Sequence, residues 1–102
     1  MKICKITVLQ TTFNEEIASG FSKPGLGPCE VFREGQEFFM EDPWTMPEGF
    51  CSGAWTDIAK NVQTICLGGE FPSAAKKGVN ISCCVDGVRP VIFKIERLGE
   101  SA

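Results

Sequence analysis

The chain has 102 residues, 43% of them hydrophobic, and a formal net charge of −3 at pH 7. This length fits a single domain spanning residues 1–102, with enough apolar residues for one modest core. The small negative charge and the lack of a basic run argue against nucleic acid and anionic membranes as partners. The apolar runs are too short to span a bilayer, and the N-terminus alternates like a strand and unlike a signal peptide, so we predict a cytoplasmic protein.

Residues 2–10 predict the first strand. Cys4, Ile6 and Val8 share one face of it, and this alternation is typical of a half-buried strand. Cys4 is therefore expected in the core. Asn14 follows at a position from which its side chain can cap a short helical turn.

The next part of the chain is rich in loops. Residues 20–28 contain three glycines and two prolines, which predicts a loop that ends at Cys29. Residues 36–40 predict a short second strand. Residues 41–49 predict another loop. Trp44 lies within it and is expected to pack over the core, with the lining of a cleft as the less favoured alternative.

The main helix is predicted from Ser52, as its N-cap, to about Leu67. Gly68-Gly69 would end it. Cys66 lies on the apolar stripe of this helix and is expected in the core. The other members of the stripe are Trp55, Ile58, Ala59, Val62 and Ile65. Cys51 precedes the helix, where free backbone N–H groups and the helix dipole favour a thiolate.

Residues 79–98 predict a hairpin with its turn at Asp86-Gly87. A two-residue loop would mix polar and apolar positions on each face, so we favour a three-residue loop, 85–87, with Gly87 left-handed. That register places Cys83 on the core face and Cys84 on the other. The remaining core-face residues are Val79, Ile81, Val91, Phe93 and Ile95, and those opposite are Asn80, Ser82, Pro90 and Ile92.

Three further residues, two in the hairpin and one in the main helix, have simple interpretations. Pro90 has no N–H for a ladder, which indicates a sheet edge or a bulge. Arg89 is expected to pair with Asp86. Asp57 lies on the polar side of the main helix and is expected to be solvated.

The element order, strand, strand, helix, strand, strand, predicts an α+β domain. It consists of a small, largely antiparallel sheet of about four strands, with a C-terminal hairpin, packed by one main helix. Residues 100–102 are expected to form a tail.

The six cysteines dominate the chemistry that the sequence allows, because the chain has no histidine. In a reducing compartment they indicate buried thiols, metal ligands or redox groups more than disulfides. Cys29, Cys51 and Cys84 lie at element ends or on a polar strand face, which makes them the candidate site. A metal held by such thiolates would be zinc or part of an iron–sulfur centre. The alternative is that all six are buried apolar residues.

The chain also carries several short motifs, of which three contain these cysteines. They are Gly27-Pro28-Cys29, Gly49-Phe50-Cys51 followed by Ala54-Trp55, and Cys83-Cys84 followed by Asp86-Gly87 and Arg89-Pro90-Val91. Through them the chain resembles a family of small prokaryotic proteins common in anaerobes, over nearly its whole length. The resemblance implies no activity. It implies that Cys29, Cys51 and Cys84 belong to the family pattern, whereas Cys4 and Cys66 are particular to this chain.

The sequence thus supports three function hypotheses. The first is an iron–sulfur protein of anaerobic metabolism with Cys29, Cys51 and Cys84 as ligands, with zinc as the alternative metal. The second is a metal-free binding or assembly module, which would meet a protein partner or a second copy through the Trp44 loop and the strand edge at Pro90. The third is thiol redox chemistry through Cys51. Whether Cys83 replaces Cys84 as the site cysteine stays open.

Overall fold

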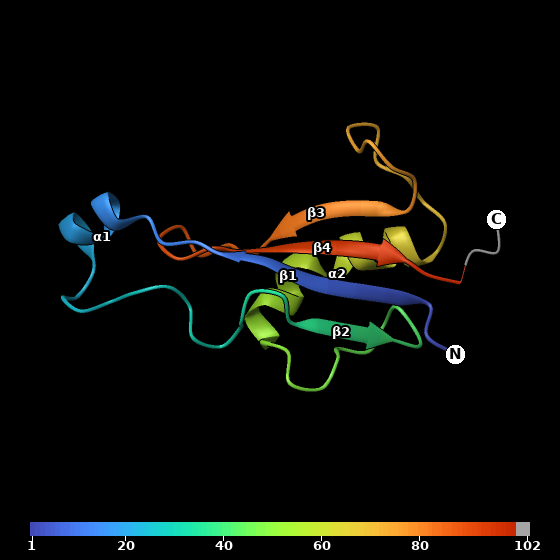
Figure 1. Cartoon of the computed structure of the whole chain (residues 1–102), viewed down its shortest axis with the longest axis horizontal. Helices are drawn as coiled ribbons and strands as arrows, with labels where there is room; N and C mark the ends of the chain where they lie inside the picture. The colour runs from blue at the N-terminus through green and yellow to red at the C-terminus, as the bar shows by residue number, and fades with distance from the viewer. Residues whose placement is uncertain (100–102) are drawn as a thin grey trace.

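A computed structural model describes residues 1–99 and has two layers, a four-stranded sheet and one helix packed on it (Figure 1). All strand pairs are antiparallel, and the order across the sheet is β2-β1-β4-β3. The strands are β1 (Cys4–Thr11), β2 (Glu37–Met40), β3 (Val79–Cys83) and β4 (Val91–Arg97), and the helices are α1 (Glu15–Phe21) and α2 (Ser52–Cys66). The predicted α+β fold is confirmed. Residues 100–102, expected as a tail, lie outside the described residues.

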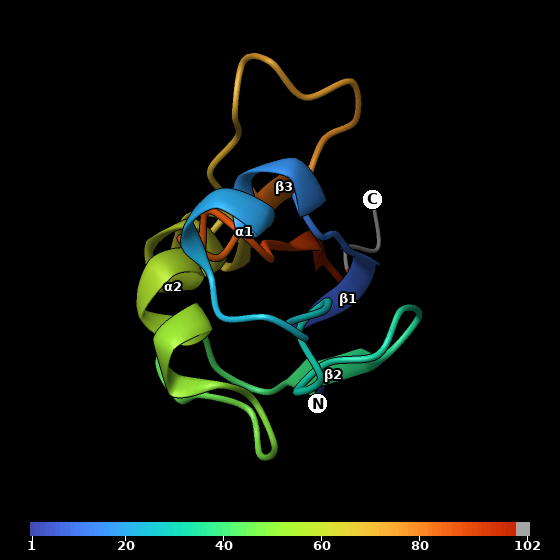
Figure 2. The same ribbon diagram turned by 90° about the vertical axis from the view of Figure 1, so that its left-hand side faces the viewer.

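Helix α2 covers one face of the sheet, while the short helix α1 projects beyond one end of it (Figures 1 and 2). The core lies between α2 and the sheet. From β1 it takes the three residues that the alternation predicts, Cys4, Ile6 and Val8, each at most 1% exposed. The strand β4 adds Val91, Phe93 and Ile95, and α2 adds Ala54, Ile58, Val62 and Ile65.

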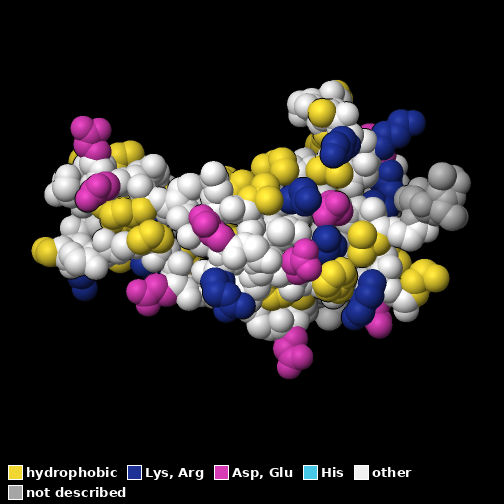
Figure 3. All heavy atoms as spheres, in the orientation of Figure 1, with side chains coloured by type: hydrophobic (Ala, Val, Ile, Leu, Met, Phe, Trp, Pro, Cys, Tyr) yellow, Lys and Arg dark blue, Asp and Glu magenta, His cyan; other side chains and the backbone are white. Residues whose placement is uncertain are grey.

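The opposite face of the sheet is open to solvent and mixes charged with apolar side chains (Figure 3). Lys5 of β1 pairs with Glu37 of β2 at 3.4 Å and with Glu96 of β4 at 3.6 Å. Phe39 and Ile81 are exposed on this part of the sheet. Opposite charges on neighbouring strands support the pairing across this open face.

The C-terminal hairpin is present, but its predicted register is wrong. Ser82 pairs with Phe93 across β3 and β4, so Ser82, and not Cys83, faces α2. Cys83 is exposed, whereas Cys84 is half-buried and packs against the core. The two adjacent thiols do point to opposite sides, as predicted, but their environments are reversed.

The register differs because a side chain of α2 makes the covered face of β3 tolerant of polar residues. The Asn61 Nδ2 donates a hydrogen bond of 2.8 Å to Ser82 Oγ. Ser82 in turn donates to the Oδ1 of Asn80. Polar side chains under a helix cost little once they are hydrogen-bonded, so the apolar Ile81 can lie on the open face instead.

The connection between β3 and β4 is longer than the predicted three-residue loop and spans residues 84–90. The Asp86 Oδ1 accepts the backbone N–H groups of Val88 and Arg89, at 2.9 and 3.0 Å. These bonds turn the chain without a left-handed residue, and Gly87 is not among the glycines with positive φ. Pro90 lies just before the central strand β4, so it marks neither an edge nor a bulge.

Both helices start close to their predicted positions, with different caps. The N-cap of α2 is Cys51, and Ser52 is the first helical residue. Gly68, with φ of 100°, follows the end of α2 in the left-handed conformation that such an end favours. Asn14 precedes α1, but its side-chain amide donates to Gly87 O at 2.7 Å and does not cap the helix.

Trp44 does not pack over the core as predicted, because its side chain is 62% exposed. The Asp42 Oδ1 accepts the backbone N–H groups of Trp44 and Thr45, at 2.7 and 2.9 Å. This turn carries the indole away from the core. Within residues 1–99, neither helix combines the length and the apolar character that crossing a membrane requires.

The end of α2 offers a direct test of which cysteines serve the core. Cys66 is half-buried beside the fully buried Ile65. We expect Cys66→Ala to lower the free energy of unfolding by on the order of 1 kcal/mol, and Ile65→Ala by about 2–5 kcal/mol. Urea unfolding of the two variants measures both. Equal losses at the two positions would contradict this account of the helix end.

Candidate functional site

A pocket of about 620 Å³ lies at the N-terminal end of α2 and is lined by Cys29, Cys51 and Cys84. These three come from three separate segments of the chain, and each is half-buried. Cys4, Cys66 and Cys83 do not line it. The structure therefore brings the three sequence-predicted cysteines to one pocket, hereafter the cysteine pocket.

Aromatic packing holds the segments of Cys29 and Cys51 in place. Phe32 follows Cys29 by three residues, and Phe50 directly precedes Cys51. The ring centroids of Phe32 and Phe50 lie 4.9 Å apart in an edge arrangement, and each ring also contacts Phe93 of β4, at 5.2 and 5.4 Å. All three rings are buried, so the two loops are anchored to the sheet at the positions beside their thiols.

The backbone of the hairpin fixes Cys84. Its N–H donates to Val91 O at 3.1 Å, which continues the ladder by one pair beyond β3. In return the Val91 N–H donates to Cys84 Sγ at 3.3 Å. A backbone N–H directed at a sulfur is a contact that tunes thiolates in metal and cluster sites.

Asp57 of α2 connects the helix to the segment that carries Cys84. The Asp57 Oδ2 accepts the backbone N–H of Val85, the next residue after Cys84, at 2.8 Å. Asp57 is exposed, as predicted, and its carboxylate also holds the backbone of the segment that carries Cys84. One signal in the sequence was available, since Asp57 follows Ala54 by three residues and so lies on the same helix face at the start of α2.

Arg89 connects the segments of Cys84 and Cys29. Its Nη1 donates to Gly27 O at 3.4 Å, and its Nε lies 3.8 Å from Asp86 Oδ2. The predicted pairing of Arg89 with Asp86 is confirmed. The pKa of Asp86 is lowered, first by the N–H groups of Arg89 and Val88 and also by the Arg89 charge.

The charged side chains of the cysteine pocket are therefore engaged with backbone or with each other. Asp57 accepts from Val85, and Arg89 binds Asp86 and Gly27. Much of the remaining wall is apolar, with Val31, Phe32, Ala54, Val85 and Val91. The groups left for chemistry are the three thiols, set in a largely apolar surround.

These thiols suit a soft metal in kind, but their placement is not that of a closed metal site. Within residues 1–99, no three His, Cys, Asp or Glu side chains are grouped so that they could hold a metal ion. Metal binding at the cysteine pocket would therefore have to draw the thiols closer together.

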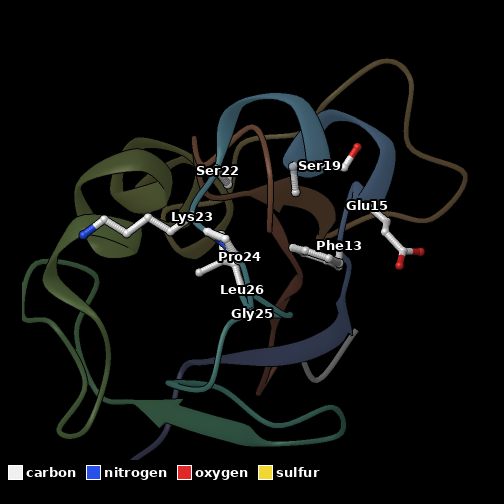
Figure 4. Close-up of a pocket in the computed structure, with 9 residues that line it drawn as sticks. Phe13, Glu15, Ser19, Ser22, Lys23, Pro24, Gly25 and Leu26 are labelled. Carbon is white, nitrogen blue, oxygen red and sulfur yellow. The ribbon is translucent and has the colours of Figure 1, made fainter.

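A second pocket, of about 340 Å³, lies beside α1 and contains no cysteine (Figure 4). Its wall includes Phe13, Ala18 and Leu26, and the charged ends of Lys23 and Glu15 extend to opposite sides of it. It offers no cluster of reactive groups comparable with the three thiols.

No family model, no curated protein and no solved structure matches the chain. The geometry of the cysteine pocket is therefore the basis on which a function can be inferred.

The contact between Asp57 and Val85 gives the second prediction. Asp57→Ala removes the acceptor of the Val85 N–H, and a hydrogen bond of this kind contributes about 1 kcal/mol. We expect the hydrogen-exchange protection of that amide to fall by about fivefold to tenfold, and Cys84 to react faster with iodoacetamide.

Lys60→Ala, one turn further along the exposed side of α2, is the matched control, and Cys83 is the internal reference for alkylation. Unchanged exchange at Val85 in Asp57→Ala would show that this contact does not hold the segment of Cys84.

Proposed function

We propose that the protein binds a thiophilic metal centre through Cys29, Cys51 and Cys84, and that this centre is an iron–sulfur cluster, with zinc as the alternative. The observation that carries the proposal is that these three cysteines, from three separate segments, line one pocket. The other three cysteines lie outside it. If the six cysteines were only buried apolar residues, nothing would explain why three of them share one pocket.

The chemistry of the donors supports a soft metal. The sequence has no histidine, so thiolate is the characteristic ligand that the cysteine pocket can offer, and thiolate favours zinc and iron–sulfur centres. The Val91 N–H directed at Cys84 Sγ and the apolar wall are further features that iron–sulfur sites use to adjust their clusters.

Charge repulsion supports a cation among the three thiols. Three thiolates drawn together repel each other, and a bound cation is the usual means of offsetting that repulsion. The N-terminus of α2 lies beside Cys51, but a helix end contributes only about half a unit charge. The free thiols of the described chain also suit the reducing cytoplasm that we propose as its compartment.

Anaerobic reconstitution tests the proposal. The purified chain is incubated with ferrous iron, sulfide and a thiol reductant, and then desalted. Bound iron and sulfide are measured per chain, and the reduced sample is examined by electron paramagnetic resonance. A parallel sample receives zinc alone. We expect stoichiometric iron and sulfide in the wild-type chain, and a loss of at least about tenfold in Cys29→Ser, Cys51→Ser and Cys84→Ser, since even outer-shell changes cost this much.

Cys83→Ser is the matched control, because Cys83 neighbours Cys84 but points to the open side. It should keep its iron and sulfide, as should Cys66→Ala. If the wild-type chain retains zinc but no iron, the metal of the proposed centre is zinc. If the wild-type chain binds neither metal, or if Cys83→Ser and Cys84→Ser lower metal binding equally, the three-thiol centre is refuted.

A metal-free binding module is the second candidate function, and the exposure of Trp44 favours it. An indole that is 62% exposed within a loop is typical of protein interfaces. If a second copy is the partner, sedimentation velocity should reveal a concentration-dependent dimer, and Trp44→Ala should weaken it by at least tenfold. A wild-type chain that remains monomeric at high concentration would argue against self-association.

A further inference from the structure

The second group of cysteines forms a contact of its own, at the other end of α2. Cys4 is the first residue of β1 and Cys66 the last of α2. Cys66 thus lies at the C-terminal end of a 15-residue helix, and a rise of about 1.5 Å per residue puts it roughly 20 Å from the cysteine pocket. Nothing in the proposed metal centre uses these two thiols.

The two thiols are neighbours in space. Cys4 is fully buried, and Cys66 is half-buried and packs against the core. Each thiol lies close enough to the other to influence its pKa. The burial of each thiol raises its pKa, so both are protonated at neutral pH.

The backbone fixes this contact independently of the thiols. Cys4 is paired with Arg97 across β1 and β4. The Arg97 Nη1 donates to Ile65 O at 2.8 Å, and Ile65 is the residue before Cys66. A second bond, from Arg97 Nη1 to Gly69 O at 3.1 Å, holds the chain just after the helix. The end of α2 is therefore tied to the strand beside Cys4.

We propose that Cys4 and Cys66 form an oxidation site, at which a peroxide converts the two neighbouring thiols into an internal disulfide. The cross-link would join the first residue of β1 to the last residue of α2, and so enclose β2 and the loops that carry Cys29 and Cys51.

Cys66 reacts first, because it is partly open to solvent and Cys4 is not. Its thiolate attacks one oxygen of hydrogen peroxide, the O–O bond breaks, and the products are a sulfenic acid and hydroxide, which takes up the thiol proton to become water. The sulfur of Cys4 then attacks the sulfur of the sulfenic acid. The S–O bond breaks, and the departing hydroxide takes the proton of Cys4 to become a second water. Two thiols have lost two electrons, and one peroxide has become two waters.

The raised pKa values decide how readily this happens. Reaction with peroxide requires the thiolate, so a buried protonated thiol reacts more slowly than an exposed one. Cys83 is exposed opposite Ile92 and should therefore be modified earlier than Cys66. The disulfide between Cys4 and Cys66 should therefore form slowly and require sustained oxidation.

The cross-link should be visible in mass and in thermal stability. Closing the chain between residues 4 and 66 restricts the unfolded state, and we expect Tm to rise by roughly 10 °C. The metal-free wild-type chain is treated with hydrogen peroxide, free thiols are blocked with iodoacetamide, and the protein is digested without reduction. The expected result is one peptide pair containing Cys4 and Cys66, about 2 Da lighter than the sum of the two thiol forms, and reversal of the Tm rise by dithiothreitol.

Cys66→Ala and Cys83→Ser are the matched variants. Cys66→Ala should lose the linked peptide and the rise in Tm, while Cys83→Ser should keep both. Repeating the treatment in the triple variant Cys29→Ser, Cys51→Ser, Cys84→Ser separates this inference from the proposed metal centre, because the cross-link should persist there. Linkage of Cys66 to any other cysteine, or its conversion to sulfinic acid with Cys4 still alkylated after denaturation, would overturn the proposal.

Discussion

The packing of Phe32, Phe50 and Phe93 is the interaction on which the cysteine pocket depends. Two of these rings belong to loops, and only Phe93 belongs to the sheet. The loops that carry them have no ladder to define their position, so the burial of each ring fixes the backbone near it. Because Cys29 and Cys51 lie within three residues of a buried ring, the aromatic cluster also determines where their thiols lie. The cysteine pocket therefore lies where the packing of these three rings places the two loops.

The fold was predictable because its main patterns are periodic. β1 has one apolar side, formed by Cys4, Ile6 and Val8, and α2 has one, formed by Ile58, Val62 and Ile65. Each of these apolar sides is buried. The hairpin register was not predictable in the same way. Apolar and polar residues alternate in β3, but Asn61 supplies a hydrogen bond to the polar side. The alternation of polar and apolar residues in β3 does not by itself show which side of the strand α2 covers.

Cys29 and Cys51 were chosen as candidates because they lie at the ends of elements, and with Cys84 they line one pocket. Cys51 lies at a helix start and Cys29 at the end of a loop, where backbone turns leave a thiol at a surface hollow. The backbone contacts of Asp57 and Arg89 were not predicted, because the groups that they bind lie 28 and 62 residues away in the chain. Contacts of a side chain with distant backbone leave no spacing pattern in a sequence. Cys84 was selected although the argument for its face was wrong, since it faces the covered side.

The thiols at the two ends of α2 lie in different surroundings. Around the start of α2, three half-buried thiols from three segments of the chain line one pocket beside the first helical turn. At its end, Cys4 and Cys66 meet in the core, where burial raises the pKa of each thiol and disfavours the charged form. The proposed metal centre would use the first group of thiols, whereas the proposed disulfide would join the second group and leave the core without charge.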